Sequence, residues 1–377
     1  MALILSVSFL LYGWKLGSLP PNFRPEEKAA VISSSSVRLI VNNPVNAPHK
    51  VAQYIVQKNF SKSTLAMRSV SVVFGLLAVF CFYLVLKWWF KYEAAILGAI
   101  LFATSPWLII NARSATAAIM FLASLSVIAA YLWMQSTEKH HNTALILAAL
   151  AGALSLYVPG VFWITIIGVL AIRKPLTNAY KSSAAVVRYS LPVLTSLILT
   201  PLIYAAVVEP KIIKELLLIP DGLLSLFESL QSIVWTGLGV VWRTRDNLPT
   251  TIGTLPVLDA LCVVLFIVGS FWMLTQVKRR RTYWLFGSLF VSIIVIGLNR
   301  QALELLLILP VIYIVVAGGL NFLYKEWFRV FPRNPLAKWL GLGVIVMVIA
   351  ISVVYSVRYS LVAWPNAPET TSHYMLQ

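Results

Sequence analysis

Residues 67–88 read MRSVSVVFGLLAVFCFYLVLKW, an apolar run with a basic residue near each end, Arg68 and Lys87. A hydrocarbon core about 30 Å thick is crossed by roughly 20 consecutive apolar residues in a helix, so this stretch predicts a membrane-spanning helix. Similar windows recur along the chain and predict an all-helical, polytopic membrane protein of about eleven spans. The windows lie near residues 2–20, 67–88, 94–110, 115–135, 142–157, 159–173, 188–208, 254–276, 283–299, 303–323 and 339–357.

The composition excludes a soluble or a disordered chain. Of the 377 residues, 59% are hydrophobic and only 11% are charged, and the mean hydropathy is +0.84. Soluble domains carry roughly 45–50% apolar and about 25% charged residues. The net charge of +17 does not indicate nucleic-acid binding, because the basic residues occur in short runs between apolar stretches. Cys81 and Cys262 lie inside such stretches, so neither a disulfide framework nor a thiolate metal site is predicted.

Lysine and arginine are divided unequally between the short loops, which predicts an orientation. Every second loop is rich in them, and these loops hold fifteen positive charges, whereas the opposite set holds only Arg113, Arg300 and Arg358. Short cytoplasmic loops carry the excess of Lys and Arg. The pattern therefore places the N-terminus in the cytoplasm and, after eleven spans, the C-terminal tail outside. We expect a multi-pass protein of the plasma membrane.

Two long loops, 21–66 and 209–253, fall on the outer face in this topology. Apolar residues recur at helical spacing over 48–60 and 211–234, which predicts amphipathic helices lying on the membrane surface. The cytoplasmic side has only connectors, so any chemistry is expected on the outer face. We expect a single transmembrane domain over residues 1–377, without a separate soluble domain.

Glu26 and Glu27 are adjacent acids just after the first span, in a chain with thirteen acidic residues. Two interpretations are open. Pro25 followed by acids is typical of the first turn of a helix, where the helix dipole favours negative charge. The same pair could supply a general base, or position an acceptor, at the mouth of an outward cavity.

Arg68, Arg113 and Arg300 each lie where an apolar span meets the outer face. Such arginines commonly extend toward lipid headgroups. Three at one level could instead hold an anionic phosphate, because the guanidinium fork matches phosphate oxygens. Glu304 follows Arg300 by four residues, so an ordinary pair within one helix competes with that role.

Several kinds of site have no sequence signal. The four histidines do not form a metal-ligand spacing with Cys, Asp or Glu, and the chain has no Gly-rich phosphate loop or nucleotide-binding fingerprint. We therefore expect no metal, no cofactor and no nucleotide-linked donor.

Five segments at the predicted outer ends of spans contain, in order, an acidic pair, an Arg-x-x-Ser-x-x-x-Gly pattern, a Ser-Pro turn with a nearby Arg, two Pro followed by Asp, and an Arg followed by Leu-Pro: Pro20–Ala30, Met67–Leu77, Phe102–Arg113, Asn247–Asp259 and Asn299–Pro310. In this order they resemble the GT-C membrane glycosyltransferases. The branch they resemble contains the protein O-mannosyltransferases and the lipid A aminoarabinose transferases, glycosyltransferase family 39. The resemblance covers most of residues 10–325.

The resemblance implies a GT-C-like bundle that takes a sugar from a polyprenyl-phosphate carrier and transfers it to a hydroxyl acceptor on the outer face. It puts Glu26 at the position of the catalytic acid and Glu27 at that of its partner. Arg68, Arg113 and Arg300 become ligands of the carrier phosphate. Two acids of the second loop region, Asp246 and Asp259, are alternative catalytic candidates.

The chain departs from the family in two respects. The family usually has Asp at the first acidic position, where this chain has Glu26, and many relatives carry an outer soluble domain. The first departure motivates an alternative, a non-catalytic relative that binds lipid-linked glycan. A lipid or glycan transporter is a further alternative, although the sequence shows no internal repeat and its ionisable residues lie near span ends.

Overall fold

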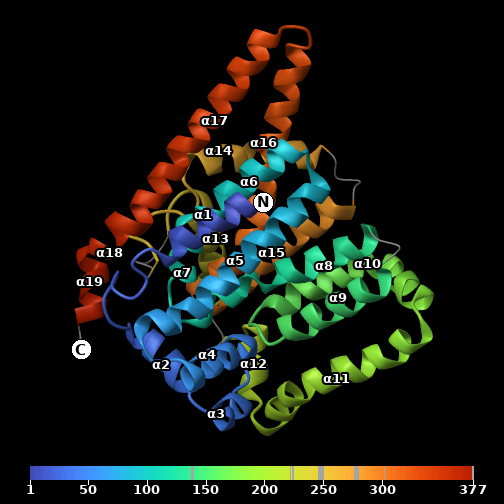
Figure 1. Ribbon diagram of the computed structural model, residues 1–377, viewed down its shortest axis with the longest axis vertical. Helices are drawn as coiled ribbons and strands as arrows, with labels where there is room; N and C mark the ends of the chain where they lie inside the picture. Colours follow the sequence, from blue (N-terminus) through green and yellow to red (C-terminus); the bar gives the residue numbers. More distant parts are fainter. Residues whose placement is uncertain are drawn as a thin grey trace.

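The computed structural model describes residues 1–136, 140–220, 222, 225–244, 250–275, 280–300 and 302–375, and these are arranged in helices and loops without a strand (Figure 1). The first half contains α1 (Ala2–Gly13), α2 (Pro25–Ser33), α3 (Val37–Asn42), α4 (Ala47–Asn59), α5 (Thr64–Trp89), α6 (Tyr92–Ala103), α7 (Pro106–Ala112), the 3-10 helix η1 (Ala117–Ala123), α8 (Ser124–Ser136) and α9 (His141–Ser155). The second half contains α10 (Val161–Ser182), α11 (Ala185–Val208), α12 (Lys211–Leu217), α13 (Leu226–Val241), α14 (Ala260–Leu274), α15 (Arg280–Asn299), the 3-10 helix η2 (Ala302–Leu307), α16 (Leu309–Val330), α17 (Pro335–Arg358), the π-helix η3 (Tyr359–Ala363), α18 (Trp364–Asn366) and α19 (Pro368–Met375).

The helices confirm an all-helical membrane protein. Within the described ranges, seven helical segments are long and apolar enough to cross a membrane, and an eighth is added if the bent pair α6–α7 is one span. The other three predicted spans fall on shorter apolar helices, α1, α9 and α14. The count of eleven spans therefore stays a prediction.

The bend between α6 and α7 lies at the sequence Thr104-Ser105-Pro106. Pro106 occupies the first turn of α7, where its missing N–H costs nothing, and the Ser105 hydroxyl accepts a hydrogen bond from the Leu108 N–H (3.3 Å). The two helices consequently meet at 57°. This break sets the direction of α7, at whose end Arg113 lies.

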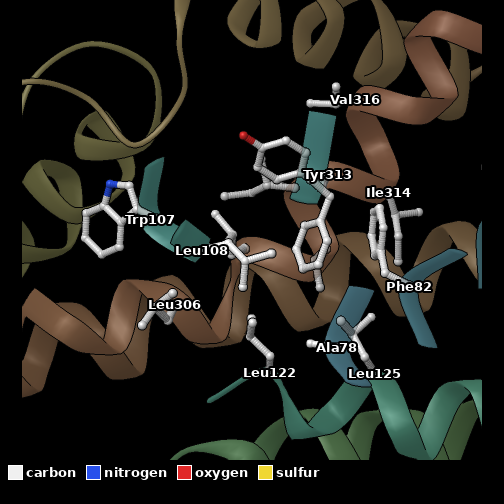
Figure 2. Close-up of a cluster of buried hydrophobic side chains, with 14 of the residues drawn as sticks. Ala78, Phe82, Trp107, Leu108, Leu122, Leu125, Leu306, Tyr313, Ile314 and Val316 are labelled. Carbon is white, nitrogen blue, oxygen red and sulfur yellow. The ribbon is translucent and has the colours of Figure 1, made fainter. Parts of the chain in front are cut away.

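The core is made of interlocking aromatic and aliphatic side chains from helices far apart in the sequence (Figure 2). The rings of Phe82 and Phe102 stack with centroids 4.1 Å apart, and Tyr313 meets Phe102 edge-on at 5.6 Å. Lipid tails are as apolar as these side chains, so within a membrane their close packing, rather than escape from water, holds the helices together. This core joins α5, α6 and α16.

Helices α14 and α16 approach each other at two glycines. A Cβ atom on Gly319 would lie 2.1 Å from the Leu265 carbonyl oxygen, and one on Gly269 would lie 2.0 Å from the Val315 carbonyl oxygen. No larger residue fits at this distance between backbones. Small residues at such crossings are what allows membrane helices to pack closely.

Replacing Gly319 by Val is therefore expected to separate α14 from α16. Overpacking of this kind typically costs about 1–3 kcal/mol in stability, measurable as a lower melting temperature of the detergent-solubilised protein by tryptophan fluorescence. Gly343→Val is the matched control, because a Cβ atom added to Gly343 would have no heavy atom within 4 Å. Equal melting temperatures for the two variants would contradict the close crossing.

The bundle has two distinct ends (Figure 1). The hairpin between α16 and α17 projects from one end, and α2, α3, α4 and α12 gather at the other. Helix α17 runs along the bundle and leads to α19, so the C-terminal segment returns toward α2. We call the end that carries α2 the α2 end.

Segments of the two long loops meet at the α2 end. The predicted helix over 48–60 corresponds to α4, and that over 211–234 to α12 and α13. Val45 from the first loop shares a small buried cluster with Ile212 and Leu216 of α12. The Asn46 N–H donates to the Tyr157 carbonyl (2.7 Å), and the Gly160 N–H donates to that of Leu216 (2.8 Å). The turn between α9 and α10 thus holds both loops.

Candidate functional site

Glu27 and Arg68 form a buried ion pair at the start of α2. Both side chains are fully buried. The Arg68 Nε–H donates to Glu27 Oε1, and its Nη2 donates to Oε2, each at 3.0 Å. This two-pronged geometry gives the strongest and most directional form of a charged hydrogen bond.

The remaining donors of Arg68 are also used within the protein. Nη1 donates to the carbonyl oxygens of Leu16 (3.1 Å) and Pro20 (2.8 Å), and Nη2 donates to that of Asn22 (2.7 Å). A guanidinium has five N–H donors, and each of those in Arg68 now has an acceptor. Arg68 therefore fixes the backbone that connects α1 to α2.

Glu27 has two backbone partners besides Arg68. The Ala115 N–H donates to Oε1 (2.7 Å), and the Arg24 N–H donates to Oε2 (3.0 Å), which caps α2. Burial alone would raise the pKa of the Glu27 carboxyl. The hydrogen bonds and charge of Arg68, the charge of Arg24 and the Ala115 N–H outweigh it, so the pKa lies below its ordinary value. Glu27 is thus a carboxylate held in place.

Glu26 differs from its neighbour in exposure. It lies in the first turn of α2, and its side chain is exposed while that of Glu27 is buried. The ion pair of Glu27 fixes the turn from which Glu26 projects. The arrangement leaves the Glu26 carboxylate accessible, at a position set by its buried neighbour.

Arg113 is used in a similar way to Arg68. Its Nη1 donates to the carbonyl oxygens at the end of α1 and just beyond, and Nη2 donates to that of Leu19 (3.0 Å). The acceptors of Nη1 are Leu11 (3.3 Å), Tyr12 (2.9 Å) and Trp14 (2.7 Å). A cation at the last carbonyls of a helix satisfies groups that have no partner within the helix. Arg68 and Arg113 together therefore hold the segment between α1 and α2.

Arg300 lies on a different element, immediately after α15. Its side chain is exposed and its backbone is left-handed, with φ at 59°. Glu304 does not form an ion pair with it among the described residues; Glu304 is buried and accepts a hydrogen bond from the Asn299 amide (2.7 Å) instead. The Arg300 guanidinium is accessible.

The two aspartates predicted as alternative catalytic acids are Asp246 and Asp259. Asp259 caps α14, where its Oδ1 accepts from the Cys262 N–H (2.7 Å), and its Oδ2 accepts from the Ser352 hydroxyl. Both oxygens thus have structural partners. Asp246 lies outside the described residues.

Three residues at this site carried no clear signal in the sequence. Arg24 is buried beside Glu27, and the ring of Tyr374, from α19, covers it with the guanidinium carbon 5.7 Å from the ring centre. His49 is buried on α4, and its Nε2 lies 2.9 Å from the Ser71 hydroxyl. Arg24 could have been noticed from its place beside the acidic pair. Tyr374 could not, because 350 residues separate the two in the chain.

Among the described residues no group of three His, Cys, Asp or Glu could hold a metal.

Residues 45–219 match the family model of dolichyl-phosphate-mannose-protein mannosyltransferase. A search of curated protein sequences finds no match.

Solved structures resemble the whole chain. The structure of ArnT from Cupriavidus metallidurans in the apo state is 13% identical, with a TM-score of 0.59, covering 99% of this chain and 77% of that one. The same protein bound to undecaprenyl phosphate gives 13% and 0.53, covering 97% and 75%. The archaeal oligosaccharyltransferase AglB from Archaeoglobus fulgidus, in complex with an inhibitory peptide and a dolichol-phosphate, gives 15% and 0.57, covering 97% of this chain and 55% of its own. At these identities the similarity shows a shared fold.

Proposed function

Because this chain is a multi-pass membrane protein with the fold of the GT-C glycosyltransferases, we propose that it transfers a sugar from a polyprenyl-phosphate carrier to a hydroxyl acceptor. The acceptor oxygen attacks the anomeric carbon, the bond between that carbon and the phosphate oxygen breaks, and polyprenyl phosphate leaves. Glu26 takes the proton of the attacking hydroxyl. The phosphate is a good leaving group, so orientation and proton removal are the main requirements.

One observation carries this proposal: an exposed carboxylate, Glu26, stands beside a buried, fully paired carboxylate, Glu27. The two adjacent acids therefore have different tasks. Glu27 and Arg68 position the first turn of α2, and Glu26 is the group that can meet a substrate. Glu performs the same proton transfer as the Asp usual in the family, with a reach longer by one methylene.

The three predicted phosphate ligands differ in whether their N–H groups already have acceptors within the protein. The N–H groups of Arg68 are all directed at protein acceptors, and Arg113 donates to four carbonyl oxygens. We therefore assign both to positioning the loop before α2. Arg300 is exposed and keeps the proposed role of a ligand for the carrier phosphate.

The outer face is the proposed side of the reaction, because the basic loops predict that the α16–α17 hairpin is cytoplasmic and the α2 end is outside. Single cysteines at Lys28 and Arg333, both exposed, test this in intact cells after Cys81 and Cys262 are replaced. A membrane-impermeant maleimide is expected to label position 28 and to leave position 333 unlabelled. The opposite pattern would reverse the topology.

The function is tested by following a labelled sugar. Purified protein is incubated with radiolabelled undecaprenyl-phosphate sugar and an extract of the cell envelope as acceptor source. Transfer moves the label from the organic phase into an acceptor fraction and leaves undecaprenyl phosphate behind. Binding of the carrier without release of undecaprenyl phosphate would favour the alternative, a non-catalytic relative. Movement of intact carrier across a vesicle membrane without cleavage would favour a transporter.

A further inference from the structure

The region around Glu27 contains more buried positive than buried negative charge. Arg24, Arg68 and Arg113 are 5%, 0% and 6% exposed, and Glu27 is the buried carboxylate that faces them in the described part of the chain. Arg68 takes up its charge. Burying a cation without a counter-ion is costly, so the excess indicates that an anion completes the site.

Arg24 differs from Arg68 and Arg113, because some of its N–H groups have no close acceptor. Its Nε–H is buried and lacks a partner among the described residues, and its Nη2 reaches the Ser114 hydroxyl only at 3.5 Å, the long limit of a hydrogen bond. Arg68 and Arg113, in contrast, each donate to several oxygens closer than this. Arg24 also precedes Glu26 by two residues, at the start of the same helix.

The C-terminal segment covers this guanidinium. The Tyr374 ring lies over Arg24 at 5.7 Å and over Arg68 at 6.0 Å, within the range of a cation–π contact. Its helix, α19, is tethered to the loop before α14, because the Gly253 N–H donates to Glu369 (3.1 Å). An aromatic face attracts a buried cation less strongly than an anionic group does.

We propose that Arg24 binds the phosphate group of the lipid-linked donor, and that Tyr374 on α19 covers Arg24 until the phosphate displaces it. The identification of the phosphate as that of a donor rests on the proposed function; the recognition of a lipid-linked phosphate does not. Nε and Nη2 of a guanidinium form the fork that matches two phosphate oxygens. In the bound state the phosphate supplies the missing negative charge beside Glu26.

Equilibrium binding of undecaprenyl phosphate to the full-length protein in phosphatidylcholine nanodiscs tests this site. Arg24→Gln is expected to raise Kd by at least about tenfold, the effect of losing one charged hydrogen bond. Tyr374→Ala is expected to lower Kd by about twofold or more, because the ring no longer competes for the cation. Lys28→Gln removes an exposed cation from the same helix and should leave Kd unchanged. If Arg24→Gln does not fold, Arg24→Lys keeps the charge, loses the fork and should still weaken binding.

The source of the phosphate is distinguished by competition. Undecaprenol, which lacks the phosphate, inorganic phosphate, which lacks the lipid, and added phosphatidylglycerol should each compete poorly with undecaprenyl phosphate. Equal competition by phosphatidylglycerol would overturn the donor assignment. An unchanged Kd in Arg24→Gln would overturn the site, and an unchanged or higher Kd in Tyr374→Ala would overturn the cover. Wild-type protein that binds the carrier through Arg24 but never cleaves a donor would refute the transferase and leave this site standing.

Discussion

Replacing Glu27 by Gln is expected to lower the free energy of unfolding by about 3–5 kcal/mol, the usual loss when one partner of a buried ion pair is removed. The Arg68 charge would remain fully buried against carbonyl oxygens alone. The amide nitrogen of Gln would also place a donor against the Ala115 or Arg24 N–H. Denaturant unfolding of the detergent-solubilised protein, followed by tryptophan fluorescence, measures the change.

Two controls separate this pair from charge in general. Glu326→Gln breaks the surface pair of the partly exposed Glu326 with the exposed Arg329 on α16 and should change stability by no more than about 1 kcal/mol. The double variant Glu27→Leu with Arg68→Met should recover part of the loss, because no buried charge is left unpaired. Equal stability of Glu27→Gln and Glu326→Gln would contradict the structural role of Glu27. Since the pKa of Glu27 is lowered in the folded protein, its contribution is present above the unfolded value and is lost as the pH falls through the folded one.

Replacing Glu26 by Gln is expected to reduce kcat by about 10²–10⁴-fold, the usual contribution of a general base. Gln preserves the shape of the side chain but does not accept the proton of the acceptor hydroxyl. Glu26 is exposed, so stability and the Kd for the carrier should stay near wild type. Steady-state release of undecaprenyl phosphate, with binding measured on the same preparation, separates these effects.

Glu26→Asp restores the acid usual in the family and should retain activity. Glu209→Gln changes another exposed acid, at the end of α11, and should leave kcat unaltered. If Glu26→Gln kept full turnover, Glu26 would be only a helix-start residue. Asp246 would then be the acid to test next, since both oxygens of Asp259 accept structural hydrogen bonds.

Much of the fold was predictable because each span is determined by the apolar residues within it. A run of apolar residues such as 67–88 has only one stable arrangement in a bilayer, a helix that satisfies its own backbone. The break before α7 lies at Ser105-Pro106, although residues 94–110 were predicted as one span. The number of spans was harder to predict, because α1, α9 and α14 are shorter than a full span. Whether each of them crosses the membrane depends on the helices packed around it.

The different environments of Glu26 and Glu27 could not be predicted from the sequence. Both residues fit the first turn of a helix, and both fit a catalytic pair. The choice depends on which of them faces Arg68, and Arg68 lies 41 residues away. The helix-start interpretation holds for Glu27, which caps α2, and it does not exclude the site interpretation, because Glu26 stays exposed.

The roles of the arginines depended on acceptors that have no sequence signature. Backbone carbonyls of residues 11–22 surround Arg68 and Arg113 only after α1, α5 and α7 have packed. A basic residue at the end of a span could equally contact lipid, phosphate or backbone. Asp259, predicted only as an alternative catalytic acid within the span 254–276, caps α14 in the structure, a position that Asp commonly takes immediately before an apolar helix.

The central claim is tested most directly by the single-turnover release of undecaprenyl phosphate in proteoliposomes that contain either wild type or Glu26→Gln, with protein in excess over labelled donor and with acceptor extract. We predict that wild type converts nearly all of the bound donor to undecaprenyl phosphate in this single turnover. Glu26→Gln should bind the same amount of donor and release undecaprenyl phosphate at least about 100 times more slowly. Equal rates for the two proteins would contradict the account, because the exposed carboxylate beside the buried pair would then have no part in the reaction.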